Sequence, residues 1–214
     1  MLTVQDLHKS YRSKSKIIKS RLTEFTNILE SSDDKKLFEE MVFCILTAGT
    51  SAKLCLQVIP EIKNVIHTGS KEQITKILKR CYRFYNLRAD YIFVTREYLR
   101  NEFNLEIRKM LLSFEDRLER RDFLAQNKNI KGLGYKESSH FLRNIGFKEY
   151  AILDKHIIGY LNELGVINEA KSPSSRKKYL EIENSFKEFA IVNDFDIDEL
   201  DLLLWSEKTG AILK

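Results

Sequence analysis

Proline and glycine are scarce in this chain of 214 residues. Proline occurs twice, at positions 60 and 173, and glycine occurs eight times. Because both residues interrupt helices, their scarcity favours helices joined by short connections. Hydrophobic residues make up 43% and charged residues 31% of the chain, which is an ordinary composition for a globular protein. We therefore expect a mainly helical globular fold.

Long apolar runs are also missing. The longest ones, such as residues 41–48, are far shorter than the roughly 20 apolar residues that a membrane-spanning helix needs. Residues 1–16 contain no apolar stretch of the kind that a secretory signal peptide requires. The sequence thus predicts a cytoplasmic protein without a membrane partner.

Cysteine and histidine are too few and too scattered for a metal cluster. Cys44, Cys55 and Cys81 form no C-x-x-C pair, so we interpret them as reduced, mostly buried thiols. Three cysteines cannot supply the four ligands of an iron–sulfur cluster. The four histidines, at positions 8, 67, 140 and 156, have no zinc-ligand spacing. We expect neither a metal ion nor an organic cofactor.

The excess of positive charge is small. The chain has 36 Lys and Arg against 31 Asp and Glu, which gives a formal net charge of +5. This balance is compatible with a polyanionic partner such as DNA, but many proteins without such a partner are equally basic.

Apolar residues recur at three- and four-residue steps along most of the chain, which is the spacing of one helix face. Residues 32–34 are a plausible cap for a very apolar helix that we expect to be the central core helix. Pro60 is expected to interrupt the helix that begins near Ser51, and Gly210 to close the last helix. The helices predicted in this way cover residues 16–31, 35–48, 51–59, 71–80, 87–103, 115–127, 135–146, 179–192 and 197–209.

No window of alternating apolar and polar residues rivals these helical patterns, so the predicted fold class is all-α. There is no internal repeat and no low-complexity tract. The two ends of the chain can share one lobe while the middle forms the other, although the pattern does not fix that boundary.

The segment that carries chemistry is residues 129–156, NIKGLGYKESSHFLRNIGFKEYAILDKH. A glycine turn at Gly132 and Gly134 separates two helices, and both glycines can take positive φ and allow a close approach of another backbone. The N–H groups at the start of the second helix, together with the helix dipole, can bind a phosphate. Such a contact positions DNA without reading its sequence. The alternative is a plain helix–turn–helix corner in which the glycines serve geometry alone.

Two side chains of this segment have a catalytic interpretation. Lys136 lies in the first turn of the second helix, where the helix dipole disfavours a positive charge. A neutral amine is the form that attacks a sugar carbon. Asp154 follows the apolar run 150–153, and a carboxylate held near that amine can move protons and stabilise a developing positive charge. The ordinary alternatives are a solvated lysine and a helix N-cap.

The stretches GLGYK, SHFLRNIG and AILDKHI together resemble the hairpin signature of the helix-hairpin-helix DNA glycosylases. The sequences of residues 129–146 and 200–214 resemble those of the compact type-2 8-oxoguanine DNA glycosylase/lyase group, and the similarity includes residues 43–52 and 83–92. The resemblance implies one glycosylase unit over residues 1–214, with two helical lobes and a hairpin at about 120–146 in the cleft between them. It also implies removal of 8-oxoguanine from DNA, followed by β-elimination through a lysine Schiff base.

Carried over residue by residue, the resemblance makes Lys136 the nucleophile and Asp154 the assisting carboxylate. Phe84 and Trp205 match the aromatic residues that sandwich the extruded base. Lys214 matches the C-terminal lysine that tells oxidised guanine from guanine. Gly49 departs from the pattern, because asparagine is expected after LTA.

Taken without the resemblance, Phe84 and Trp205 are ordinary core aromatics. Asp201 lies four residues before Trp205 on one helix face, so its carboxylate can accept hydrogen bonds from the Watson–Crick N–H groups of guanine; a surface acid is the equal alternative. The carboxylate of Lys214 can accept the N7–H that 8-oxoguanine has and guanine lacks, although a last residue is usually solvated. Further contacts with the DNA backbone are predicted for Gly132, Gly134, His140 and Arg143, and a structural hydrogen bond for His156.

The predicted partner is double-stranded DNA containing 8-oxoguanine, bound by a monomer that associates with the nucleoid through DNA. Two alternatives stay open. The chain can be a glycosylase/lyase for another oxidised base, or a non-catalytic helix-hairpin-helix protein that docks on DNA.

Overall fold

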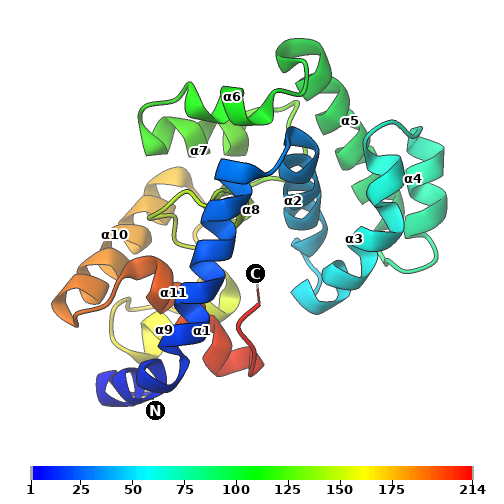
Figure 1. Cartoon of the computed structure of the whole chain (residues 1–214). Coiled ribbons are helices and arrows are strands. Elements are labelled where there is room, and N and C mark those ends of the chain that lie inside the picture. Colours follow the sequence, from blue (N-terminus) through cyan, green and yellow to red (C-terminus); the bar gives the residue numbers. More distant parts are fainter. Residues whose placement is uncertain (1, 214) are drawn as a thin grey trace. The chain divides into compact units, whose positions relative to one another are not determined.

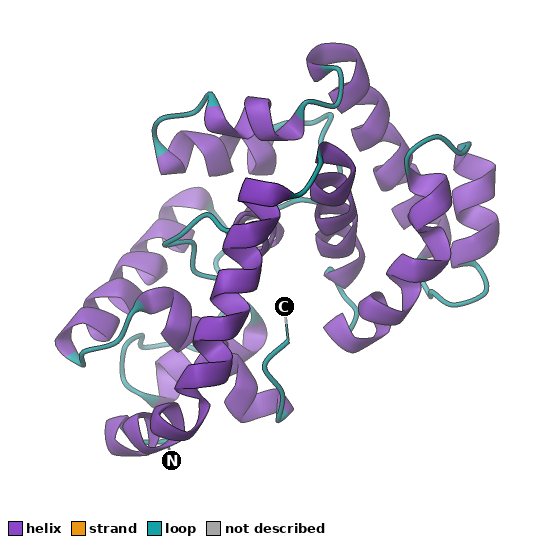
Figure 2. Cartoon of the chain, viewed as in Figure 1, coloured by secondary structure: helices purple, strands orange, loops and turns teal. Residues whose placement is uncertain are grey.

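The computed structural model describes residues 2–213, which form eleven helices and no strand (Figures 1 and 2). This confirms the predicted all-α class. Within the same residues no helix is both long and apolar enough to cross a membrane. The helices are α1 (Val4–Ser31), α2 (Asp34–Thr47), α3 (Ala52–Ile66), α4 (Lys71–Leu78), α5 (Tyr85–Phe103), α6 (Ile107–Leu112), α7 (Arg117–Gln126), α8 (Tyr135–Asn144), α9 (Lys155–Glu163), α10 (Arg176–Val192) and α11 (Ile197–Thr209).

The chain divides into two compact units. The terminal unit comprises the segment up to Asn27 and the segment from Leu142 onward, and the middle unit comprises Ile28–Phe141. The two ends therefore share one unit, as the sequence suggested. Both boundaries fall inside helices, because α1 and α8 each contribute residues to both units.

The middle unit is built around α2. Nearly every residue of this helix from Leu37 to Thr47 is buried, and α2 packs against α3, α5 and α6. Asp33 caps it by accepting a hydrogen bond from the Lys36 N–H at 2.8 Å. The prediction of a capped central core helix is confirmed.

In the terminal unit α11 packs against both α9 and α10. Its apolar residues Leu200 and Leu202–Leu204 are buried. Gly146, which follows α8, has φ +101°, and a Cβ at this position would lie 2.7 Å from Cα of Thr26. Glycine is therefore required here, because the backbone after α8 lies directly against α1.

Some predicted helix boundaries were wrong. α1 begins at Val4 rather than at residue 16, because Thr3 and Asp6 cap its start and Leu7 is fully buried. α3 continues through Pro60 instead of stopping there, since Val58 and Ile62 on either side of Pro60 are buried on one face of the helix. The helices α6 and α9 had no counterpart among the predicted ranges.

Candidate active site

The hairpin consists of α7, a turn over residues 127–134, and α8. Asp116 caps α7 by accepting hydrogen bonds from the N–H groups of Leu118 and Glu119 at 2.6 and 2.9 Å. Helix α5 holds the turn from the side: Thr95 accepts a hydrogen bond from the Lys131 N–H at 2.8 Å, and the Tyr98 hydroxyl accepts one from the Asn127 amide at 2.8 Å. The turn is therefore fixed by side chains of a neighbouring helix within the middle unit.

The two glycines of the turn differ in what they do. Gly132 has φ +80°, as the sequence suggested, and a Cβ there would lie 2.7 Å from Cδ2 of Tyr91. The expected close approach of another backbone at Gly132 was wrong, because the close neighbour is a side chain. Gly134 has no positive φ. Its carbonyl accepts a hydrogen bond from the Ser138 N–H at 2.8 Å, which is the first bond of α8. Gly134 thus marks the start of the helix.

Lys136 lies in the first turn of α8, as predicted. Its side chain is 29% exposed, and Nζ lies 2.9 Å from Oε1 of Glu137. Tyr135 ties α8 to α7, because its hydroxyl donates to Asp122 at 3.0 Å and also bonds the side-chain amide of Gln126. The amine is therefore partly exposed on a helix start that its neighbours hold in place. Glu137, which the sequence analysis did not single out, is its nearest charged partner.

Asp154 is the N-cap of α9 in the terminal unit. Its Oδ1 accepts hydrogen bonds from the N–H groups of His156 and Ile157 at 2.8 and 2.9 Å. The capping role considered from the sequence is thus confirmed. Because Lys136 belongs to the middle unit and Asp154 to the terminal unit, their meeting at one sugar stays a prediction.

Phe84 is the one predicted aromatic residue of the middle unit. It precedes α5 and is 38% exposed, and the Arg83 guanidinium lies 5.2 Å from its ring centroid. Several large apolar residues of the described chain are exposed, so the exposure of Phe84 is not special in itself. Its aromatic ring can nevertheless serve as a stacking platform for a base. Gly49 has φ +84°, and a Cβ there would lie 3.7 Å from the Phe84 ring. Asparagine tolerates this backbone better than most residues, so the departure at position 49 keeps the local conformation.

In the terminal unit, Trp205 is half-buried on α11, whereas Leu204 and Ser206 on either side of it are buried. Lys214 lies outside the described residues, so the prediction for its carboxylate is not addressed by the structure.

His140, Arg143 and Asp201 lie in the interior. His140 is edge-on to Phe43, with the ring centroids 5.8 Å apart. Arg143 is paired with Asp201 at 3.5 Å and lies over the ring of Phe25. A residue that contacts a phosphate or a base has to be accessible to DNA, and these three side chains are buried. Their predicted contacts with DNA stay predictions.

Burial raises the pKa of two carboxyl groups on α11. Removal from water raises the pKa of Asp201 to about 7, against the opposing effect of the Arg143 guanidinium. The same cause raises the pKa of Asp198 to about 6, although Asp198 accepts hydrogen bonds from the Glu149 N–H at 3.1 and 3.2 Å. Both groups therefore titrate near neutral pH, far above an ordinary aspartate.

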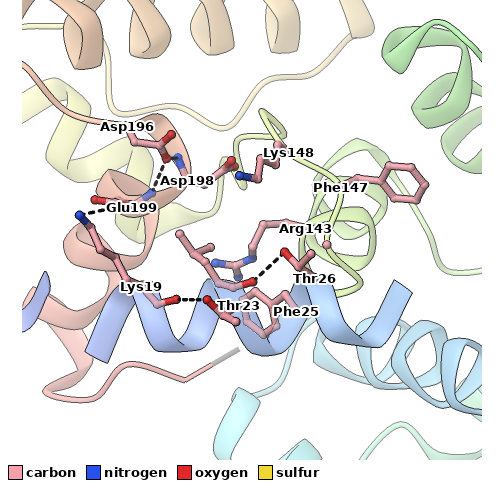
Figure 3. A pocket seen from close by; sticks show the side chains of 12 residues that line it. Lys19, Thr23, Phe25, Thr26, Arg143, Phe147, Lys148, Asp196, Asp198 and Glu199 are labelled. Atoms are coloured by element: carbon pink, nitrogen blue, oxygen red, sulfur yellow. Dashed lines mark hydrogen bonds and ion pairs between the residues drawn. The ribbon is translucent and has the colours of Figure 1, made fainter. Parts of the chain in front are cut away.

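A polar cavity of about 220 Å³ lies beside these groups in the terminal unit. Figure 3 shows the acidic residues at the start of α11 facing Lys19 of α1, whose Nζ lies 3.9 Å from Glu199. Acidic and basic residues are equally numerous in its lining, namely Asp196, Asp198 and Glu199 against Lys19, Arg143 and Lys148. The balanced charges indicate internal packing rather than a site for a charged ligand. Among the described residues no group of three His, Cys, Asp or Glu side chains is placed to hold a metal ion.

An all-helical fold whose glycine turn opens a helix with a lysine in its first turn defines a helix-hairpin-helix protein of the DNA glycosylase kind. The model of the 8-oxoguanine DNA glycosylase family matches residues 18–195. The chain therefore belongs to the 8-oxoguanine DNA glycosylase family, which confirms the resemblance seen in the sequence.

Relatives match over the full length. The chain is 38% identical to an 8-oxoguanine DNA glycosylase/AP lyase of Methanocaldococcus jannaschii over 216 residues, which is 100% of both chains. It is 37% identical to a protein of the same name from Fusobacterium nucleatum, over 98% of this chain and 96% of the relative.

Two solved structures of 8-oxoguanine DNA glycosylases have the same fold as this chain. The M. jannaschii glycosylase/lyase, crystallised with a 15-mer DNA containing 8-oxoguanine, matches with a TM-score of 0.90 and 36% identity over 99% of each chain. The 8-oxoguanine DNA glycosylase of Thermotoga maritima matches with a TM-score of 0.87 and 31% identity, over 99% of this chain and 98% of that chain.

Proposed function

We propose that this chain removes 8-oxoguanine from double-stranded DNA in base excision repair and then nicks the abasic strand, with the amine of Lys136 as the nucleophile and Asp154 as the assisting carboxylate. The observation that carries the proposal is the position of Lys136, partly exposed in the first turn of α8 directly after the glycine turn. Full-length relatives named for both activities support it.

The hairpin binds the DNA backbone. The start of α8, with its first N–H groups and the positive end of the helix dipole, binds a backbone phosphate next to the lesion. The damaged nucleotide leaves the stack at a cost of a few kcal/mol. Phe84 and Trp205 stack on the faces of the extruded base, and Lys214 takes part in its recognition.

The chemistry then proceeds in two steps. The neutral amine of Lys136 forms a bond to C1′ while the glycosidic bond breaks, and the departing base takes the electron pair and a proton. Asp154 stabilises the positive charge that develops on the sugar and moves protons. The sugar ring opens to a Schiff base, a C2′ proton is lost, and the bond to the 3′ phosphate breaks by β-elimination. No step needs a metal ion or an organic cofactor.

Trapping with borohydride tests the proposal, because reduction fixes a Schiff base as a covalent protein–DNA adduct. We expect an adduct with duplexes that contain 8-oxoguanine or an abasic site, and none with undamaged guanine. Lys136→Gln should lose the adduct entirely. Lys109→Gln is the matched control, since Lys109 is 80% exposed on α6 and pairs only at the surface with Glu106.

Each other outcome points to a different function. An adduct that persists in Lys136→Gln removes this lysine as the nucleophile. Faster trapping on thymine glycol than on 8-oxoguanine makes the chain a glycosylase for oxidised pyrimidines. Tight binding to DNA without any adduct makes it a docking protein.

A further inference from the structure

The four residues before Asp154 combine two features that seldom occur together. Residues 150–153 form neither helix nor strand, yet all four are buried. A buried backbone N–H or carbonyl without a partner costs free energy comparable to a lost hydrogen bond. This segment therefore needs partners that regular secondary structure does not supply.

Side chains of α10 and α11 supply these partners. Oε1 of Glu183 accepts a hydrogen bond from the Ala151 N–H at 3.1 Å, and Oδ1 of Asp201 accepts one from the Ile152 N–H at 3.3 Å. The Tyr179 hydroxyl accepts from the Leu153 N–H at 3.3 Å and donates to the Ala151 carbonyl at 2.7 Å. Three consecutive N–H groups are thus held by three different side chains.

The holding side chains are themselves fixed. Tyr179 and Glu183 are four residues apart on one face of α10, and both are buried, as is Asp201 on α11. Burial of carboxylates is costly, and an apolar contact of similar size is often as stable or more stable. An arrangement this costly favours a role beyond packing.

Asp154 comes directly after the held segment. Its N–H donates to the Ile152 carbonyl at 2.7 Å, so it is bonded to the same residue that Asp201 holds. Its Oδ1 is held from the other side by the first N–H groups of α9. Residues 151–153 therefore fix the backbone from which the Asp154 side chain extends, and the N–H groups of α9 hold its carboxylate.

We propose that Tyr179, Glu183 and Asp201 are positioning residues, which aim the Asp154 carboxylate for base excision by holding the backbone of residues 151–153. This inference rests on the proposed function, because it takes Asp154 as the carboxylate that assists Lys136. It gives Asp201 a role in place of the base contact predicted from the sequence.

Tyr179→Phe is the sharpest test, since it removes the hydroxyl and keeps the ring that packs. We expect the single-turnover rate of 8-oxoguanine excision to fall about tenfold or more, because small misplacements of a catalytic group are costly. The dissociation constant for the 8-oxoguanine duplex should change less than about threefold. Tyr160→Phe on α9 is the matched control and should retain the wild-type rate. All rates are compared at a temperature at which circular dichroism shows each variant folded.

The second arm asks whether Tyr179 acts through Asp154. In an Asp154→Asn background, Tyr179→Phe should cause no further loss of rate, because there is no longer a carboxylate to aim. A purely structural role would slow both backgrounds by the same factor, which would overturn the proposal.

The third arm uses Asp201 and needs no activity from Asp154→Asn. Asp201→Asn keeps an oxygen that can accept the Ile152 N–H, whereas Asp201→Ala does not. We expect the asparagine variant to retain most of the excision rate and the alanine variant to lose about tenfold. Equal loss in both would refute the role of Asp201 as an acceptor for the Ile152 N–H, because both variants also lose the ion pair with Arg143. Loss of preference for 8-oxoguanine over guanine in the asparagine variant would instead support a contact of Asp201 with the base.

The two proposals fail separately. A wild-type protein that excises nothing from an 8-oxoguanine duplex refutes the proposed function. An active wild-type protein whose rate Tyr179→Phe leaves within twofold refutes the positioning role alone.

Discussion

Oδ1 of Asp154 accepts a hydrogen bond from the backbone N–H of Ile157 at 2.9 Å. The same oxygen accepts the His156 N–H, so the capping of α9 uses one carboxylate oxygen and neither bond engages Oδ2. A single residue can thus cap a helix and still present an oxygen for chemistry. The two roles place different demands on the side chain, because the cap needs only an acceptor and the chemistry needs a charge.

Asp154→Asn and Asp154→Ala separate these roles. The asparagine variant keeps an acceptor for the cap, so its free energy of unfolding should stay within about 0.5 kcal/mol of wild type, while the alanine variant should lose roughly 1 kcal/mol. Both should lose about 10²-fold or more in single-turnover excision, because both lack the carboxylate. Urea denaturation and a gel assay of excision measure the two effects. Normal excision by the asparagine variant would restrict Asp154 to capping.

The region around Asp154 shows how far sequence reasoning reaches. The capping role of Asp154 and the position of Lys136 at a helix start were both predicted, because each follows from local spacing along the chain. The acceptors Tyr179 and Glu183 were missed, since their partners are backbone groups some 30 residues away, and no spacing rule connects side chains to a loop at that distance.

Helix boundaries show the same contrast between local spacing, which can be read from the sequence, and contacts between distant residues, which cannot. The cores of most helices were predicted from their three- and four-residue apolar spacing. The start of α1 was missed because Leu7 is its only buried residue before Ile18, which leaves no periodic pattern to read. Asp201 was correctly placed on the last helix, but the spacing that relates it to Trp205 does not reveal that its carboxylate is buried against the Ile152 N–H.

Gly146 should be among the least replaceable positions of the terminal unit. Gly146→Ala places a Cβ 2.7 Å from Cα of Thr26 at φ +101°, which combines backbone strain with a clash against α1. We expect a loss of about 2–4 kcal/mol in the free energy of unfolding. Gly165→Ala is the matched control, since Gly165 also has positive φ, +73°, but no atom lies within 4 Å of its added Cβ.

The control should lose only about 1 kcal/mol, from backbone strain alone. Urea denaturation followed by circular dichroism gives both values. Equal losses in the two variants would show that the contact with Thr26 contributes nothing beyond strain.

Phe84 should matter for DNA and little for folding. Because Phe84 is 38% exposed, Phe84→Ala should lower the free energy of unfolding by less than about 1 kcal/mol. Loss of stacking should weaken binding to a duplex with 8-oxoguanine by about 1–3 kcal/mol. Leu112→Ala is the control, since Leu112 on α6 is an exposed apolar residue of the same unit. Fluorescence anisotropy measures the affinities, and equal weakening in both variants would rule out a specific stacking role.

The buried carboxyl group of Asp201 should make stability depend on pH. Its pKa is raised to about 7 in the folded chain from 3.8, so between these values the folded state binds more protons than the unfolded state. Stability attributable to this group therefore rises as pH falls through about 7, and the cost of burying the charge is fully present above that pH. Asp201→Asn carries no titrating group at this position.

We therefore expect the free energy of unfolding of wild type, relative to Asp201→Asn, to increase by up to about 3 kcal/mol between pH 8 and pH 5. Asp198, whose pKa is raised to about 6, is present in both proteins, so the difference reports Asp201 together with its repulsion by Asp198. Urea denaturation of both proteins at four pH values across this range measures the trend. A difference that stays constant with pH would mean that Asp201 is already ionised throughout, with the Arg143 guanidinium outweighing burial.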